Sequence, residues 1–306
     1  MPIDPPALST ALSWAVLGLF VGSFLNVCIH RLPLEDETIH HPRRSRCPSC
    51  RATLSWKENV PVLSWLVLRG RCKHCAWRIP ARYPLVELGN AGLWFWTVHQ
   101  AGPANWPLWV LWSVALSGLL VATMVDIDHF EIPDQISIGG MFLAPVACLL
   151  VPAVHADTSL ALLLSASDAV GVDRLGALVG GLAGMAVGGG ILYAVGWVGT
   201  RAYGTEAMGF GDVKLLAAGG GLLGPGGVLV ALMMAAFTAS VFGIANMVRY
   251  LCLSRSRAQR RGRRDPVRRS VRIARTAGRY LPFGPFLALG IGIALLHWND
   301  VMALRP

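Results

Sequence analysis

Apolar blocks long enough to cross a lipid bilayer are the feature that most restricts the fold of this chain. A helix needs about 20 apolar residues to cross the hydrocarbon core of a membrane. Such blocks occur at 11–29, 83–101, 106–125, 136–154, 175–198, 215–248 and 281–298. The block 215–248 is too long for one span, and the GPGG sequence at 224–227 divides it in two. We therefore expect an all-α polytopic membrane protein with eight transmembrane helices, one of which, 83–101, contains the acidic Glu87.

The composition excludes several other kinds of protein. Hydrophobic residues make up 54% of the chain and charged residues 14%, whereas an ordinary soluble domain has about 25% charged residues. Such a chain is not disordered, not a coiled coil and not a small disulfide scaffold, and it does not resemble an ordinary water-soluble enzyme.

Basic residues predict which loops face the cytoplasm. The first block has no basic region before it and no A-x-A cleavage site, and its first basic residue, Arg31, comes after the apolar run. This order predicts an uncleaved first helix with the N-terminus outside. With alternating spans, the loops 30–82, 199–214 and 249–280 share one side and hold 25 of the 27 Lys and Arg residues. The positive-inside rule assigns that side to the cytoplasm.

Two loops have unusual compositions. Segment 254–279 contains 11 arginines, and we expect a solvated basic loop that contacts anionic lipid. Nucleic-acid binding is not expected, because no aromatic residues are interleaved with these charges. Loop 155–173 lies on the outside, has no Lys or Arg, and contains an LALLL run that favours a short interfacial helix.

Glycines recur every four residues in the block 175–198. Gly176, Gly180, Gly184 and Gly188 would form one stripe on a helix. Stripes of small residues allow a neighbouring helix to approach closely, so we expect a packing role for these glycines.

Four cysteines in the first basic loop have the spacing of a metal site. Cys47, Cys50, Cys72 and Cys75 form two C-x-x-C pairs separated by 21 residues. Four thiolates at this spacing are typical of structural zinc sites, and disulfides are disfavoured in the cytoplasm. We favour structural zinc, with a redox dithiol or an iron–sulfur site as alternatives. Four sulfur ligands leave no open position for water, so the metal would hold the loop without activating a reactant.

Acidic residues gather at two predicted helix ends on the cytoplasmic side. VDIDHFEIPD at 125–134 follows the third span, and GFGD at 209–212 precedes the sixth. We therefore expect Asp126 and Asp212 to meet at one membrane boundary. Ionisable groups at that depth indicate function, because their burial is costly.

Two such carboxyl groups suit the hydrolysis of a peptide bond. If they share one proton, the ionised group can take a proton from water while the protonated group polarises the scissile carbonyl. The absence of side chains at Gly209 and Gly211 would let an extended substrate approach Asp212. Ion coupling in a transporter and a purely structural role remain open alternatives from these residues alone.

Several motifs, in order along most of the chain, resemble the type IV prepilin peptidases, which belong to the GxGD intramembrane aspartyl proteases. The motifs are GSFLNVCIHRLP at 22–33, CPSC, CKHC, RYPLVELGN at 82–90, VDIDHFEIPD at 125–134 and GFGDVKLLAA at 209–218. The resemblance implies a bifunctional leader peptidase and N-methyltransferase of the bacterial inner membrane. Its substrates would be type IV prepilins or type II secretion pseudopilins, cut after a glycine on the cytoplasmic side.

The resemblance also implies roles for individual residues and cofactors. Asp126 and Asp212 correspond to the catalytic aspartates, and the four cysteines to the metal-binding loop. S-adenosylmethionine would supply the methyl group, although no dinucleotide-type glycine fingerprint marks its site. Asp128, Glu131 and Asp134 could attract a basic leader, and Gly209 and Gly211 could border the substrate. A non-enzymatic scaffold that docks partners through a zinc loop would leave the paired aspartates without a role.

These expectations give a domain plan in five parts. Residues 1–29 form the first transmembrane helix, 30–82 the cytoplasmic zinc-binding loop domain, and 83–253 the transmembrane peptidase core. An arginine-rich cytoplasmic loop at 254–280 and a last helix with the C-terminus at 281–306 complete the chain.

Overall fold

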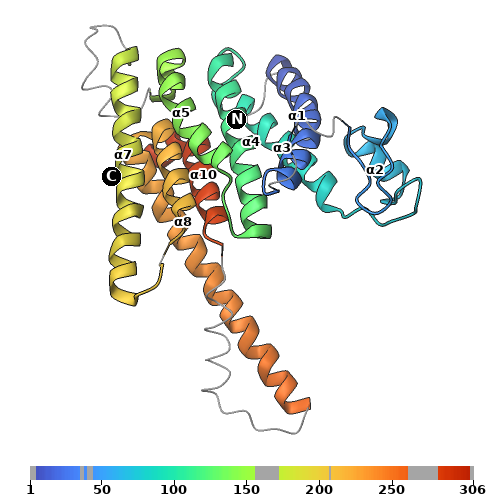
Figure 1. Cartoon of the computed structure of the whole chain (residues 1–306). Helices are drawn as coiled ribbons and strands as arrows, with labels where there is room; N and C mark the ends of the chain where they lie inside the picture. The colour runs from blue at the N-terminus through green and yellow to red at the C-terminus, as the bar shows by residue number, and fades with distance from the viewer. Residues whose placement is uncertain are drawn as a thin grey trace.

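The computed structural model consists of helices over the residues it describes, which are 5–34, 38–39, 44–155, 172–206, 208–260 and 282–303. Figure 1 shows the long helices packed side by side, with the segment that carries α2 at one edge. The long helices are α1 (Pro5–Arg31), α3 (Arg82–Ala101), α4 (Trp106–His129), α5 (Asp134–Leu150), α7 (Arg174–Tyr203), α8 (Phe210–Arg260) and α10 (Gly284–Ala303). The short elements are η1 (Trp56–Glu58), α2 (Leu63–Val67) and η2 (Pro152–His155).

The predicted apolar blocks coincide closely with these helices. Helices α1, α4, α7 and the part of α8 up to Leu253 are long and apolar enough to cross a membrane. Helices α5 and α10 contain shorter apolar stretches. The break predicted within 215–248 is present in α8, where Gly224 leaves helical geometry with φ 70 and ψ 177, and Pro225 follows. We call the part of α8 before Gly224 (210–223) its first arm and the part after it (225–260) its second arm. The total of eight spans stays a prediction, because length and apolar composition select four of the described helices as long enough to cross a membrane.

One loop prediction is partly wrong. Segment 254–279 was expected to be loop throughout, but α8 continues to Arg260. Arginine, alanine and glutamine are good helix formers, so the basic residues after the apolar run extend the helix. Figure 1 shows this second arm of α8 extending beyond the other helices. The rest of that loop, from 261, and the LALLL run of the outside loop lie outside the described residues.

The glycine stripe of α7 packs against the first arm of α8, as predicted. All four glycines of the stripe are buried. A β-carbon built on Gly184 would lie 2.0 Å from the carbonyl oxygen of Gly220, and one on Gly188 would lie 2.7 Å from that of Leu216. At these two glycines the backbone of α7 therefore lies directly against the backbone of α8.

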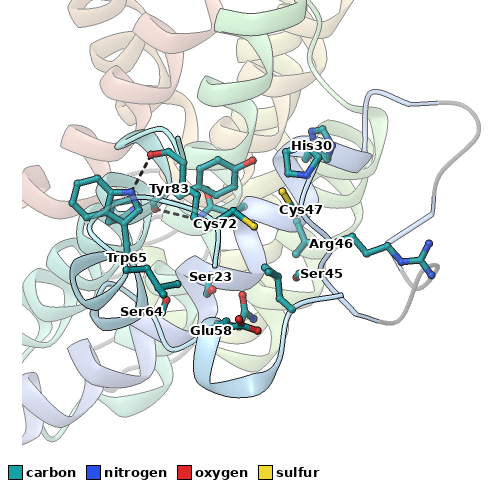
Figure 2. A pocket seen from close by; sticks show the side chains of 18 of the residues that line it. Ser23, His30, Ser45, Arg46, Cys47, Glu58, Ser64, Trp65, Cys72 and Tyr83 are labelled. Carbon is teal, nitrogen blue, oxygen red and sulfur yellow. Dashed lines mark hydrogen bonds between the residues drawn. The ribbon is translucent and has the colours of Figure 1, made fainter. Parts of the chain in front are cut away.

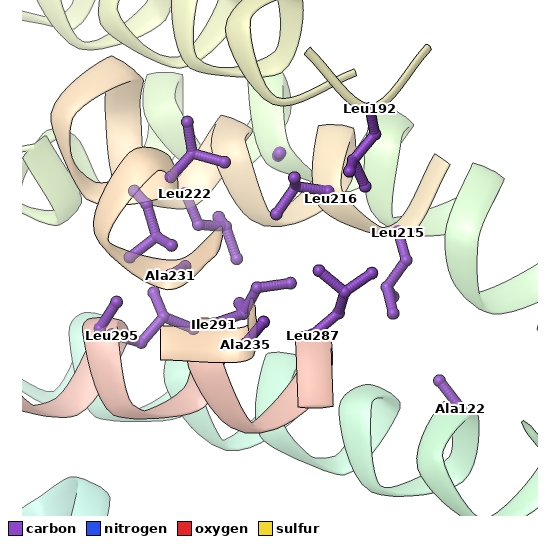
Figure 3. Packing of buried hydrophobic residues seen from close by; sticks show 14 of the residues in the cluster. Ala122, Leu192, Leu215, Leu216, Leu222, Ala231, Ala235, Leu287, Ile291 and Leu295 are labelled. Atoms are coloured by element: carbon purple, nitrogen blue, oxygen red, sulfur yellow. The ribbon is translucent and has the colours of Figure 1, made fainter. Parts of the chain in front are cut away.

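The first arm of α8 also packs against α10. Figure 3 shows Leu216 of α8 and the α10 residues Leu287 and Ile291 within the main core cluster. Each of these three side chains is at most 1% exposed. Through this core, packing fixes the beginning of α8 relative to the beginning of α10.

A polar network joins α1, α3 and α4 inside the apolar bundle. Asn90 donates to the Gly18 carbonyl at 2.8 Å and accepts from the Ser117 hydroxyl at 2.8 Å. The Trp94 indole donates to the same hydroxyl at 2.9 Å. Because lipid offers no hydrogen-bond partners, such groups satisfy one another and hold the helices in register.

We expect Gly184→Ala to destabilise the bundle, since its β-carbon would overlap the Gly220 backbone. Overpacking of this kind costs about 1–3 kcal/mol. Gly190→Ala is the matched control, because a β-carbon there meets nothing within 4 Å. Thermal unfolding of detergent-solubilised protein should show a lower Tm for the first variant and an unchanged or slightly higher Tm for the second. Equal Tm values would contradict the backbone contact.

Candidate active site and metal centre

Asp126 is a buried carboxyl group at the C-terminal end of α4. Its side chain lies one turn before the helix ends at Phe130, which adopts a left-handed backbone with φ 58. The residue is 5% exposed. Its Oδ2 accepts a hydrogen bond from the backbone N–H of Gly284 at 3.0 Å. The first residue of α10 therefore fixes the orientation of this carboxyl group.

Gly284 leaves no room for a side chain at this contact. A β-carbon at that position would lie 2.6 Å from Asp126 Oδ2 and 3.1 Å from Ile132 Cδ1. Only glycine allows the α10 backbone to approach the carboxyl group so closely.

Asp212 lies in the first turn of α8 and is partly buried. Its amide donates to the carbonyl of Gly209 at 3.2 Å. A β-carbon on Gly211 would lie 3.1 Å from Cβ of Ile132, so this glycine allows the segment after α4 to pack against the start of α8. Ile132 thus separates the backbones at Gly211 and Gly284.

Asp126 and Asp212 lie in one region of the fold, because Ile132 packs against both Gly211, the residue before Asp212, and Gly284, whose amide binds Asp126. They come from the end of α4 and the beginning of α8, and α10 packs against both helices. The structure therefore brings together the two aspartates selected from the sequence. Two adjacent carboxyl groups, one of them with a fixed orientation, can activate a water molecule between them.

The other acids of the 125–134 motif have different surroundings. Asp128 forms an ion pair with Arg82 at the start of α3. Asp134, the first residue of α5, forms one with Lys214 of α8. Glu131 is exposed. Two of the three acids proposed to attract a basic leader are therefore already paired with cations.

The four cysteines of the predicted metal site lie together. Their sulfur atoms are all within 4.8 Å of one another. Tetrahedral zinc with bonds of about 2.3 Å places sulfurs about 3.8 Å apart, and the Sγ atoms of Cys47 and Cys75 are 3.8 Å apart. The donor set and its size fit zinc. His74 lies outside this group and contacts Glu58 at 3.5 Å.

The two C-x-x-C pairs fold in the same way. In each, the amide of the first cysteine, Cys47 or Cys72, donates to the carbonyl five residues later at 2.9 or 2.8 Å. Its carbonyl accepts from the residue four positions later, Arg51 or Ala76, at 2.8 or 2.9 Å. Those two residues have left-handed backbones with φ 57 and 55. Two matching turns therefore present two sulfurs each.

Three contacting residues were not selected from the sequence. Gly284 binds the Asp126 carboxyl group through its backbone, and Arg82 and Lys214 pair with acids of the 125–134 motif. Arg82 and Lys214 do belong to the quoted motifs RYPLVELGN and GFGDVKLLAA. No periodicity or spacing in the sequence connects Gly284 with a residue 158 positions away.

Comparisons with known proteins agree with this arrangement. A family model described as Bacterial Peptidase A24 N-terminal domain matches residues 16–101. A second, described as Type IV leader peptidase family, matches residues 113–244. The four cysteines lie in the first region, and both aspartates lie in the second.

Curated relatives cover nearly the whole chain. The prepilin leader peptidase/N-methyltransferase of Aeromonas hydrophila is 33% identical over 312 residues, which are 93% of this chain and 89% of the relative. The chain belongs to the type IV leader peptidase family. A member from Stutzerimonas stutzeri with the same description is 33% identical over 317 residues, covering 96% of this chain and 92% of the relative.

A family member with a different description also matches nearly the whole chain. The type 4 prepilin-like proteins leader peptide-processing enzyme of Escherichia coli O78:H11 is 32% identical over 313 residues, covering 97% of this chain and 95% of the relative. No solved structure matches the chain.

We expect one zinc ion per chain, held by the four cysteines. Replacing Cys47 and Cys72 together by serine removes two of four sulfur ligands and should abolish zinc binding. Cys252→Ser is the control, because this cysteine is exposed and lies outside the cluster. Elemental analysis of purified protein checks the result, and metal-free native protein or zinc retained by the double variant would contradict it.

Proposed function

We propose that the chain is a membrane aspartyl endopeptidase that removes the short basic leader of type IV prepilins or pseudopilins after a glycine and then N-methylates the new N-terminus. The proposal rests on one observation above all. Asp126 at the end of α4 and Asp212 at the beginning of α8 both lie beside the contact of Ile132 with Gly284 and Gly211, in a chain that covers 89% of a prepilin leader peptidase/N-methyltransferase. The enzyme class follows from the family and from the descriptions of its members.

In the proposed cleavage step, one water molecule lies between Asp126 and Asp212. The ionised carboxylate takes a proton while the water oxygen bonds to the scissile carbonyl carbon, and the protonated carboxyl group donates a hydrogen bond to the carbonyl oxygen. The carbon–nitrogen bond then breaks, and the leaving amine nitrogen receives a proton. Since the pair shares its protons, neither residue has a fixed role as acid or base.

The surroundings of the aspartates suit an extended substrate segment. Gly209 presents backbone beside Asp212, so a substrate backbone can approach it without meeting another side chain. Gly211 has a different role from the one expected, because the space at its α-carbon is occupied by Ile132. Within the 125–134 motif, Glu131 is the exposed acid not engaged in an ion pair with Arg82 or Lys214. We therefore assign the attraction of the basic leader to Glu131 first, with smaller contributions from Asp128 and Asp134.

The second reaction would modify the amine that cleavage releases. S-adenosylmethionine, when bound, supplies an activated methyl group. The chain's own part is to hold the donor and the amine close together in the correct orientation.

We also propose that the protein spans the bacterial inner membrane several times. The N-terminus would be outside, and the zinc-binding loop and the basic segment after α8 would be cytoplasmic. Apolar side chains such as Phe20 and Phe24 of α1 are 57% and 51% exposed, which suits contact with lipid. The basic extension of α8 would contact anionic headgroups.

The transporter alternative receives no support. The relatives of this chain are described as prepilin leader peptidases and N-methyltransferases or as leader peptide-processing enzymes. Both aspartates lie at helix ends, whereas coupling ions in secondary transporters bind near the bilayer midplane.

We expect Asp126→Asn and Asp212→Asn each to abolish leader removal, since neither amide can exchange protons with water. Loss of an acid–base group costs about 10²–10⁴-fold in rate. Asp173→Asn is the control, because Asp173 is the N-cap residue of α7 and asparagine caps helices equally well. Cleavage of a purified prepilin, read by mass spectrometry, checks the result. Normal cleavage by either variant would remove the catalytic assignment.

We expect Gly284→Ala to reduce cleavage about a hundredfold, because a displacement of about 1 Å can cost that much. Its β-carbon would occupy space 2.6 Å from Asp126 Oδ2 and push the carboxyl group aside. Gly243→Ala is the control, since a β-carbon there meets nothing within 4 Å. A fall in kcat with little change in KM would indicate a displaced catalytic group. Unchanged kcat and KM in a correctly folded Gly284→Ala variant would contradict the role of Gly284 in positioning Asp126.

A further inference from the structure

A pocket lies apart from the two aspartates, where three parts of the chain meet. Its walls come from the end of α1, from the segment that carries the cysteines, and from the beginning of α3, and its volume is about 170 Å³. Figure 2 shows side chains of all three parts around it, including Ser23 of α1, Glu58 and Trp65 of the middle segment, and Tyr83 of α3. Cys47 and Cys72 also line it, so the proposed zinc ion would stabilise one wall.

Glu58 supplies an unsatisfied buried acceptor in this pocket. Its side chain is 8% exposed. One carboxylate oxygen, Oε2, accepts hydrogen bonds from the amide and hydroxyl of Ser55 at 2.8 and 2.7 Å. The other, Oε1, is buried and accepts no hydrogen bond within the described part of the chain. Buried polar atoms are rarely left without a partner, and an exception indicates a missing ligand or water.

Two features strengthen the negative character of this position. Hydrogen bonds from the Ser55 hydroxyl and amide hold the pKa of Glu58 below its usual value, so the group is ionised at neutral pH. His74 Nε2 lies 3.5 Å from Oε1, on a side chain that is 45% exposed. That contact is outside good hydrogen-bond geometry and is not a substitute for a buried cation.

Glu87 adds a second carboxylate to the lining. It is 7% exposed, and its Oε2 accepts from the amide of Val62 at 2.7 Å. In the described part of the chain, no Lys or Arg forms an ion pair with Glu58 or Glu87. Buried carboxyl groups normally have partners, so the part of the pocket beside Glu58 favours a ligand group with a positive charge.

The remaining lining suits a ligand that also has a flat ring and a carboxylate. Trp65 lies in the pocket wall with its indole N–H donating to the Ile79 carbonyl at 3.1 Å, which fixes the ring. Trp77 and Tyr83 provide further aromatic surface, and Lys73 and His30 provide cationic or hydrogen-bonding groups. Aromatic faces stack on planar heterocycles, and cationic side chains bind carboxylates.

We propose that this pocket binds the methyl donor, S-adenosylmethionine, with Glu58 and Glu87 recognising its cationic part. The proposal rests on the N-methyltransferase activity proposed above. Pockets that bury an entire ligand of drug size have volumes of about 300–1,000 Å³. The smaller volume here would accommodate the charged amino-acid part of the ligand and not the whole molecule.

A basic leader peptide is the competing occupant. Such a peptide carries several positive charges, and the basic side chains of Arg31, Arg46 and Lys73 line this pocket. Repulsion among these charges disfavours a multiply charged cation. S-adenosylmethionine carries one carboxylate alongside its positive groups, so it meets less repulsion.

The decisive variant is Glu58→Gln. Glutamine keeps an oxygen for the Ser55 hydrogen bonds but replaces the unsatisfied acceptor by an amide N–H₂ group and removes the charge. Glu87→Gln is the second variant, because its oxygen can still accept from Val62. Glu206→Gln is the control, since that acid is exposed and does not line the pocket.

The experiment measures S-adenosylmethionine binding to the detergent-solubilised, zinc-loaded full chain by calorimetry, without prepilin. We expect Glu58→Gln and Glu87→Gln to weaken binding about ten- to a hundredfold, while leader cleavage and zinc content stay unchanged. Ultraviolet crosslinking of radiolabelled S-adenosylmethionine to the native chain, followed by peptide mapping, should label peptides from 23–31 or 45–87.

The outcomes separate this proposal from the function on which it depends. Native protein that cleaves prepilin but neither binds S-adenosylmethionine nor methylates would remove the methyltransferase function itself. Native protein that binds and methylates, with both variants binding equally well, would overturn only the pocket assignment. Crosslinks confined to α7 or α8 would also overturn the pocket assignment and leave the methyltransferase function standing. If Glu58→Gln loses zinc, Glu87→Gln and the crosslinks decide. Weaker binding of a synthetic leader peptide, with unchanged S-adenosylmethionine binding, would assign the pocket to the leader.

Discussion

The hydrogen bond from the Gly284 amide to Asp126 Oδ2 is the interaction on which the peptidase geometry depends. Asp126 is 5% exposed, and a buried polar group needs hydrogen-bond partners from the protein. Here the holder is backbone at the beginning of α10, and the packing of α10 against α8 also fixes Asp212. The same helix therefore orients one aspartate directly and locates the other through the core.

Much of the fold was predictable because lipid restricts the sequence so strongly. Apolar length located the helices, and the GPGG sequence located the break at Gly224 in α8. The four cysteines were predictable as a metal site, since thiolate ligands need fixed spacing. The convergence of Asp126 and Asp212 followed from counting spans, because both lie at helix ends on one side. Their catalytic role stays a prediction that the variants test.

Features made by tertiary packing were not predictable. The continuation of α8 to Arg260 depends on the helix preference of the individual residues. The many arginines of 254–279 had indicated a solvated loop instead. The pairing of Asp128 with Arg82 and of Asp134 with Lys214 joins residues 46 and 80 positions apart, and no periodicity connects them. The unsatisfied oxygen of Glu58 is visible only after the chain folds around it.

The beginning of α3 gives a physical connection between the two proposed sites. Arg82 pairs with Asp128 and donates to the Met124 carbonyl at 3.1 Å, so it is attached to the end of α4 that bears Asp126. The next residue, Tyr83, lines the pocket proposed for the methyl donor. Arg82 and Tyr83 thus connect the end of α4 with the wall of this pocket. In the proposed reaction sequence, methylation needs the amine that cleavage releases, so a direct contact between these two parts of the fold would keep the two steps close together.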